Sequence, residues 1–142
     1  MTDCRYFVSI SEVRGSKEGY VDSKKILVVD DDASTRRLIA DIIEIMGHDV
    51  KVASSGEEAI SLCMYEDFDI ITTDLNMGNG KMNGVAMAKT IVEDLGKRLK
   101  IILVTGSGIS VEDAGHYISL IVAKPFRAEE MQFAISAVGA LR

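Results

Sequence analysis

Three acidic residues in a row follow a short apolar run near the start of the sequence. The stretch ILVVDDDAST places Asp30, Asp31 and Asp32 directly after Ile26–Val29. Two such charges about 4 Å apart repel each other by about 4 kcal/mol at an effective dielectric constant near 20. Bound Mg²⁺ would relieve this repulsion, because it prefers a few carboxylate oxygens together with water and phosphate. The three carboxylates therefore indicate a Mg²⁺ site, although acidic residues after a strand also serve as helix caps or solvated loop residues.

Single reactive side chains mark the ends of three further apolar runs. Asp74 follows FDIITT, Thr105 ends KIILVT, and Lys124 follows LIVA. An aspartate can attack phosphorus to give an aspartyl-phosphate, while a hydroxyl and an ammonium hold phosphoryl oxygens by hydrogen bonding and charge. A nearby metal would help to neutralise the phosphoryl group during transfer. Together these residue types indicate phosphoryl transfer to an aspartate.

Apolar runs of strand length alternate with amphipathic stretches of helix length five times along the chain. This alternation predicts an α/β domain with a central parallel sheet and right-handed crossovers. Ligands of such sheets bind beyond the carboxyl ends of the strands, so we expect the reactive side chains to meet at one edge. The predicted strands are KILVV (25–29), DVKVA (49–53), FDIITT (68–73), KIILVT (100–105) and LIVA (120–123).

Capping residues and glycines set the expected limits of the helices. Ser34 or Thr35 can cap the first helix, and Gly47 suits its end. Ser55 and Glu58 have capping-box spacing at the start of the second helix. The remaining helices are predicted at NGVAMAKTIVEDLG (83–96), near 110–117 and near 128–138.

Length and composition favour one globular domain. The chain has 142 residues, of which 47% are hydrophobic and one is proline. It is therefore long enough to bury a hydrophobic core without stabilising disulfides or metals. No apolar run approaches the roughly 20 residues that span a bilayer, and the net charge of -6 argues against general nucleic-acid binding. Cys4 and Cys63 lack metal-binding or redox spacing, so we expect reduced thiols in a cytoplasmic protein. His48 follows a helix-ending glycine and is expected to be exposed.

The first 23 residues differ in character from the rest. The stretch SEVRGSKEGYVDSKK is polar and has no helical or strand period, which predicts a flexible arm or linker. RYFVSI (5–10) can pair as a short strand or dock on the domain, and disorder is equally compatible with it. We therefore expect an arm at 1–23 and a single domain at 24–142.

Four motifs, in this order, resemble the receiver domain of two-component response regulators. The resemblance covers Lys24 to Arg142 and implies a flavodoxin-like fold, a doubly wound five-stranded parallel sheet of strand order 2-1-3-4-5. It implies that Asp74 accepts a phosphoryl group from a histidine kinase or a phosphotransfer histidine. The motifs are KILVVDDDASTRR, FDIITTDLNM, IILVTGSG and VAKPF.

The resemblance also implies a metal site. Asp30 and Asp31 would form its acidic pair. Asp31, Asp74 and the backbone carbonyl of Asn76 would be the direct Mg²⁺ ligands, with Asp30 acting mainly through water.

Two further residues are placed on the phosphoryl oxygens by the same resemblance, Thr105 and Lys124. It implies a cis peptide bond between Lys124 and Pro125. Asp32 falls outside the family set and is expected at the surface or at a helix start, where it suits the helix dipole.

The sequence departs from the family pattern in two places. The loop LNMGNGKMNG after Asp74 is longer than usual and has Gly78 where a proline is common. The switch position of the last strand, often aromatic in the family, is Ile121 here. A tyrosine swinging inward therefore cannot be the output, and the short segment between Thr105 and Lys124 predicts a short or irregular fourth helix.

These observations favour a stand-alone phosphorylation switch that signals through an unknown partner protein, because the final helix ends the chain. One alternative is a phosphorylation-independent pseudo-receiver that serves as an interaction module. Another is a phosphatase of the haloacid-dehalogenase class, which needs a second aspartate where Asn76 stands. We therefore expect no enzyme activity beyond the domain's own phosphorylation and slow dephosphorylation.

Overall fold

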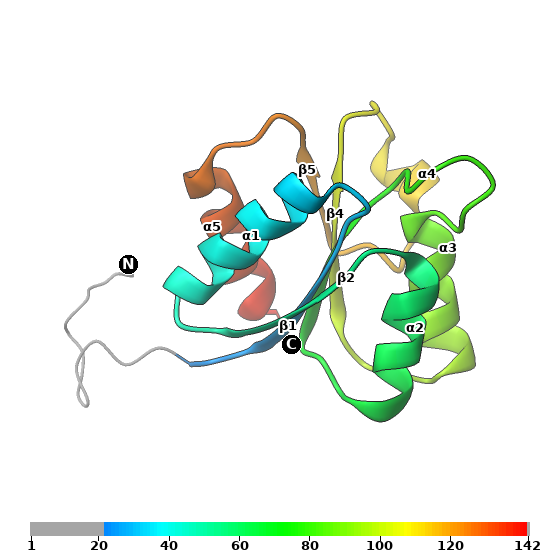
Figure 1. Cartoon of the computed structure of the whole chain (residues 1–142), viewed down its shortest axis with the longest axis horizontal. Helices are drawn as coiled ribbons and strands as arrows, with labels where there is room; N and C mark the ends of the chain where they lie inside the picture. Colours follow the sequence, from blue (N-terminus) through cyan, green and yellow to red (C-terminus); the bar gives the residue numbers. More distant parts are fainter. Residues whose placement is uncertain (1–21, 142) are drawn as a thin grey trace.

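The computed structural model describes residues 22–141, so the predicted arm at 1–23 lies outside the described residues except for its last two. Five strands and five α-helices alternate along this part of the chain (Figure 1). The strands are β1 (Lys25–Val29), β2 (Asp49–Ala53), β3 (Ile70–Asp74), β4 (Lys100–Thr105) and β5 (Leu120–Ala123). The helices are α1 (Ala33–Ile45), α2 (Gly56–Tyr65), α3 (Gly84–Lys89), α4 (Val111–Ala114) and α5 (Ala128–Gly139), and a π-helical turn η1 (Thr90–Asp94) continues α3.

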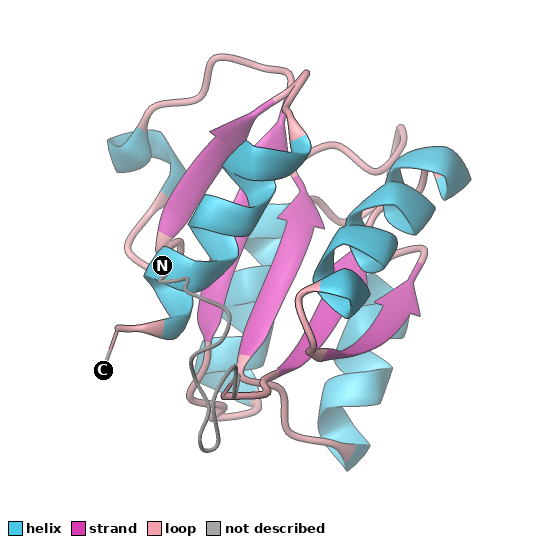
Figure 2. Ribbon diagram, turned by 90° about the vertical axis from the view of Figure 1, so that its left-hand side faces the viewer, coloured by secondary structure: helices cyan, strands magenta, loops and turns pink. Residues whose placement is uncertain are grey.

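The strands form one parallel sheet in the order β2-β1-β3-β4-β5. The predicted flavodoxin-like fold and strand order are therefore confirmed. Helices α1 and α5 cover one face of the sheet, and α2, α3 and α4 cover the other (Figures 1 and 2). Parallel strands buried on both faces are apolar along their whole length, which explains the short unbroken runs in the sequence.

Each face of the sheet has its own apolar core layer. Ile39 and Ile43 of α1 pack with Met131 of α5 against one face. Cys63 of α2 and Met87 of α3 pack against the other. Burial of these two layers fixes the register of the central strands, because a shift by one residue would exchange the faces.

The first helix begins two or three residues earlier than predicted. Asp32 caps it: one carboxylate oxygen accepts the backbone N–H of Thr35 at 2.9 Å and its hydroxyl at 2.6 Å. The prediction of a Ser34 or Thr35 cap is therefore wrong, because Asp32 already has the extended backbone of a cap. Its expected position at a helix start is confirmed. Gly47 ends the helix with a φ of 96°, as predicted.

The second helix has a modified capping box. Ser55 accepts the backbone N–H of Glu58, as predicted. The Glu58 carboxylate, however, bonds to the backbone N–H of Ser54 at 2.8 Å, one residue before the cap. The reciprocal bond of the motif is thus displaced by one position.

The ends of other strands and helices also differ from those expected from the sequence. The third strand begins at Ile70, although Phe68 before it is buried. The predicted single helix over 83–96 is α3 followed by η1, ending at Gly96 with a φ of 68°. The short fourth helix is confirmed and consists of Val111–Ala114 alone.

His48 is half-buried, so its expected exposure is wrong. Its Nδ1 accepts the backbone N–H of Lys24 at 2.9 Å, where the chain enters β1. Within residues 22–141, no helix has the length and apolar character needed to cross a membrane.

Candidate functional site

The carboxyl ends of the strands bring the predicted reactive residues to one edge of the sheet. Asp30 and Asp31 follow β1, and Asp74 ends the adjacent β3. Thr105 ends β4, and Lys124 follows β5. From β1 the chain adds β2 on one side of the sheet and β3 on the other, so the order of strands changes direction between β1 and β3. This edge therefore includes the topological switch point at which such folds bind ligands.

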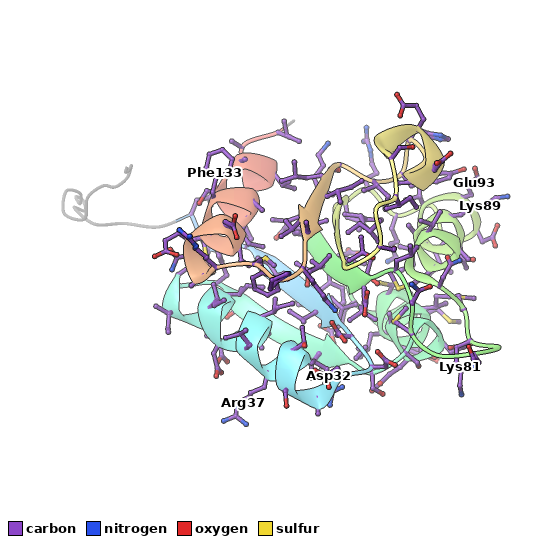
Figure 3. All side chains as sticks on the ribbon, turned by 90° about the horizontal axis from the view of Figure 1, so that it is seen from above. Asp32, Arg37, Lys81, Lys89, Glu93 and Phe133 are labelled. Atoms are coloured by element: carbon purple, nitrogen blue, oxygen red, sulfur yellow. The ribbon has the colours of Figure 1, made fainter. Side chains whose placement is uncertain are left out.

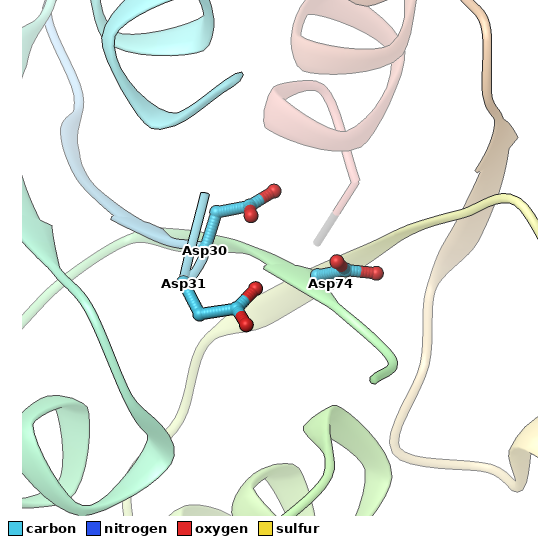
Figure 4. Close-up of side chains that lie close together, drawn as sticks. All are labelled: Asp30, Asp31 and Asp74. Atoms are coloured by element: carbon cyan, nitrogen blue, oxygen red, sulfur yellow. The ribbon is translucent and has the colours of Figure 1, made fainter. Parts of the chain in front are cut away.

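Three carboxylates lie close together at this edge (Figure 4). One oxygen each of Asp30, Asp31 and Asp74 lies within 4.8 Å of the others. Lys124 faces two of them, with its Nζ 3.1 Å from Asp74 Oδ2 and 3.4 Å from Asp30 Oδ2. One ammonium among three carboxylates leaves excess negative charge, which suits a hard divalent cation.

The Asp30 side chain is fully buried, and this changes its ionisation. Burial raises the pKa of Asp30, while a hydrogen bond from the Asp32 backbone N–H and the Lys124 charge oppose the rise. For Lys124, burial alone would lower the pKa, but the Asp74 and Asp30 carboxylates outweigh it and raise the pKa above its ordinary value. Lys124 is therefore a fixed positive charge at neutral pH.

Thr105 is buried, and its hydroxyl is already engaged. Its Oγ1 lies 2.9 Å from the hydroxyl of Ser107 and accepts the Ser107 backbone N–H at 3.2 Å. The Thr105 carbonyl accepts the backbone N–H of Lys124 at 2.9 Å, which ties the ends of β4 and β5 together. The Lys124–Pro125 peptide is cis, as predicted.

Ser107 was missed by sequence reasoning. The sequence signal was a second hydroxyl two residues after Thr105, inside the Gly106–Gly108 stretch. A short polar residue in a turn commonly bonds to a neighbour two positions away. Ile121, at the expected switch position, is half-buried and packs with the core on the α2, α3 and α4 side.

The loop after Asp74 is held at both ends. Gly84 donates its backbone N–H to the carbonyl of Leu75 at 2.9 Å, and the side chain of Met77 within the loop is buried. Asn76 is exposed at its start, two residues after Asp74. The structure thus brings Asp30, Asp31, Asp74 and Lys124 into one cluster.

Sequence comparison places the chain in a family. Residues 26–136 match the response regulator receiver domain model, so the chain belongs to that family. Domains of this family bind Mg²⁺ at an acidic pocket and interact with histidine kinases and downstream effectors.

Two curated relatives match only through part of their length. The probable transcriptional regulator ycf27 of Guillardia theta is 34% identical over 119 residues, which cover 81% of this chain and 45% of that protein. The sensor histidine kinase RcsC of Escherichia coli is 36% identical over 91 residues, which cover 64% of this chain and 9% of that protein. The chain therefore spans about half the length of the first relative and a small part of the second.

Two solved structures with the same fold match this chain over nearly their whole length. The chemotaxis protein CheY4 of Vibrio cholerae is 27% identical, with a TM-score of 0.72 over 82% of this chain and 98% of that one. The response regulator TrrA of Thermotoga maritima, solved in complex with Mg²⁺ and BeF, is also 27% identical, with a TM-score of 0.72 over 81% of this chain and 98% of that one.

Proposed function

We propose that this receiver domain is a phosphorylation-dependent switch and that Asp74 is its phosphoacceptor. The observation that carries the proposal is the contact between Asp74 and Lys124 within the carboxylate cluster. The donor would be the phosphohistidine of a kinase or of a phosphotransfer protein. We also propose that the protein is cytoplasmic. The same proposal includes a domain at 24–142 that follows an arm at 1–23.

Transfer needs an in-line attack on phosphorus. An Asp74 carboxylate oxygen forms the new P–O bond while the P–N bond to the donor histidine breaks, and its electrons return to the ring nitrogen. Lys124 stabilises charge on a phosphoryl oxygen, and Thr105 donates its hydroxyl to another once it leaves Ser107. Asp30 holds Lys124 in place from its buried position.

The residues of the cluster fit a Mg²⁺ ion. Asp31, Asp74 and the Asn76 carbonyl would hold it directly, and Asp30 through water. When bound, Mg²⁺ neutralises charge on the phosphoryl group. Asn76 has no carboxylic proton to donate to a leaving group, which argues against phosphatase turnover on outside substrates.

Labelling of the full chain with acetyl phosphate and Mg²⁺ tests the proposal by intact mass. We expect one phosphoryl adduct on the wild type and on Asp94→Asn, a control at an exposed site on η1. Asp74→Asn removes the nucleophile and should give no adduct. Asp31→Ala removes a ligand charge and should label only at much higher Mg²⁺.

Each other result has a distinct meaning. The same adduct on Asp74→Asn would reject this residue as the acceptor. A wild type that takes no phosphoryl group would favour the pseudo-receiver. Continuous release of phosphate from phosphomonoesters would favour the phosphatase.

A further inference from the structure

Two neighbouring arginines of α1 lie in different surroundings. Arg37 projects outward from the helix, and its Nε lies 3.5 Å from Asp41 Oδ1 one turn further on (Figure 3). Arg36 is half-buried, and its Nη1 donates to the backbone carbonyl of Asp30 at 2.9 Å. That carbonyl lies just beyond β1, where the Asp30 N–H makes a last bond to the Ala53 carbonyl of β2 at 3.1 Å. Arg36 therefore contacts the strand end that carries the carboxylate cluster.

The Arg36 side chain starts from a fixed base. Its backbone N–H donates to the Asp32 carbonyl at 2.9 Å in the first turn of α1, the turn that Asp32 caps. The same helix is anchored on the sheet by the buried Ile39 and Ile43. The guanidinium is planar and holds its donors in a fixed arrangement, so little freedom is lost when it bonds. The bond to Asp30 thus joins the end of β1 to the packed start of α1.

Asp31 lies between two backbone groups that are both held. The Asp30 carbonyl belongs to the peptide unit before Asp31, and the Asp32 N–H belongs to the unit after it. Arg36 bonds to the first group, and the Asp30 carboxylate accepts from the second at 2.9 Å. Because each peptide unit is planar, holding both units restricts the φ and ψ angles of Asp31.

The Asp31 side chain depends on its backbone for its direction. Asp30 is fixed by complete burial, whereas Asp31 is exposed. One Asp31 oxygen nevertheless lies within 4.8 Å of oxygens of Asp30 and Asp74 (Figure 4). Without the bond from Arg36, the peptide unit before Asp31 would be free to rotate, and the Asp31 carboxylate could turn from the cluster to solvent.

We propose that Arg36 is a positioning residue for Mg²⁺ binding: by holding the Asp30 carbonyl, it fixes the direction of the Asp31 carboxylate. The inference rests on the proposed function, in which Asp31 is a direct ligand of the ion. Arg36 does not touch the ion itself. Groups that hold metal ligands in place commonly change metal affinity by roughly ten- to hundredfold when they are removed.

Charge and positioning predict opposite effects of removing Arg36. A guanidinium repels a nearby cation, so loss of its charge alone would tighten Mg²⁺ binding. That charge also acts on α2, because hydrogen bonds from Ser54 lower the pKa of Glu58 and the charge of Arg36 acts in the same direction. Loss of positioning would instead weaken Mg²⁺ binding. The direction of the change in affinity therefore distinguishes the two roles.

Titration of the full chain with MgCl₂, without a phosphodonor, tests the proposal. Amide NMR shifts give the dissociation constant and show that each variant is folded. Arg36→Met keeps an unbranched side chain but has neither donor nor charge, and we expect about tenfold weaker binding than in the wild type. Arg37→Met is the matched control, because it removes the same charge from the adjacent outward-facing position. It should bind Mg²⁺ as tightly as the wild type or slightly more tightly.

Wild-type or tighter affinity in Arg36→Met would overturn the proposal. If that variant does not fold, Arg36→Gln takes its place, since glutamine is two bonds shorter than arginine, and the same weakening is required. A wild type that binds no Mg²⁺ would overturn both this inference and the metal site on which it rests. Weaker binding in Arg36→Met, together with no labelling of the wild type by acetyl phosphate, would support the positioning role and reject the proposed function.

Discussion

At the scale of single residues, the crowding of carboxylates is offset by one lysine. Asp30, although fully buried, accepts the Asp32 backbone N–H and faces Lys124. Asp74 shares the same ammonium. Asp31 is exposed, so water screens its charge. The site thus has one fixed cation and a remaining negative charge, a balance that a divalent metal or a phosphoryl group with its metal can complete.

His48 gives a residue-scale prediction about pH. Burial, followed by the charge of Lys24, lowers the pKa of His48 from 6.5, although Asp22, Asp69 and Asp49 act in the opposite direction. The unfolded chain therefore binds more protons than the folded one below about pH 6.5. The free energy of unfolding should fall as pH drops through this value, down to the lower folded-state pKa.

The variant His48→Asn tests this dependence. Asparagine can still accept the Lys24 N–H but does not titrate, so part of the loss of stability between about pH 7.5 and about pH 5.5 should disappear. Denaturant unfolding at several pH values measures it. His116→Gln, at the exposed second histidine, is the control. Identical slopes for His48→Asn and the wild type would contradict the prediction.

At the scale of elements, the loop from β3 to α3 is fixed by close packing at Gly84. A Cβ atom at this position would lie 2.4 Å from the Asp74 carbonyl oxygen and 3.0 Å from Thr73 Oγ1. The start of α3 is thus packed against the strand end that carries the proposed phosphoacceptor. Only a glycine permits this approach without a shift of the backbone.

Gly84→Ala should therefore destabilise the protein even though alanine is the better helix former. We expect a loss of more than about 1 kcal/mol in the free energy of unfolding, together with slower labelling of Asp74. Gly139→Ala, at the end of α5, is the control, because the nearest atom would lie 3.7 Å from a Cβ there, which is an ordinary contact distance. Urea titration and timed mass spectrometry give the two readouts, and equal behaviour of the two variants would contradict the steric argument.

Elements were predictable from the sequence to different degrees. The parallel strands were found because burial on both faces leaves short apolar runs such as Lys100–Thr105, whose limits agree with the structure. The capping residue of α1 was not found. Asp32, Ser34 and Thr35 are all good capping residues, and only the backbone conformation shows that Asp32 is the cap. The π-helical turn at Thr90–Asp94 was also missed, because its apolar pattern is that of an α-helix.

The position of the candidate site could be predicted from the sequence, but its hydrogen bonds could not. Strand ends of a parallel sheet must converge, so the meeting of Asp30, Asp74 and Lys124 followed from topology. The hydrogen bond between Thr105 and Ser107 did not follow from topology, because it depends on the path of the loop after β4. The metal ligands and the phosphoacceptor stay predictions until labelling tests them.

At the scale of the whole molecule, we expect the site to act on the rest of the protein through Thr105. Its hydroxyl is bonded to Ser107 at the start of the loop that leads to α4. A phosphoryl group on Asp74 would compete with Ser107 for that hydroxyl. Gly106 and Gly108 flank Ser107 and lower the cost of backbone rearrangement. Because Ile121 replaces the usual aromatic residue, the loop and α4 are the elements we expect to carry the signal.

Hydrogen exchange with and without beryllofluoride, a phosphoryl mimic, tests this relay in the presence of Mg²⁺. We expect the largest change in protection over residues 105–122, since loss of the Thr105–Ser107 bond frees the loop that holds α4. Asp74→Asn treated in the same way should show no change, which controls for binding elsewhere. Changes confined to residues 74–84 would instead mean that the switch is local, and a partner would then have to contact the phosphorylated site directly.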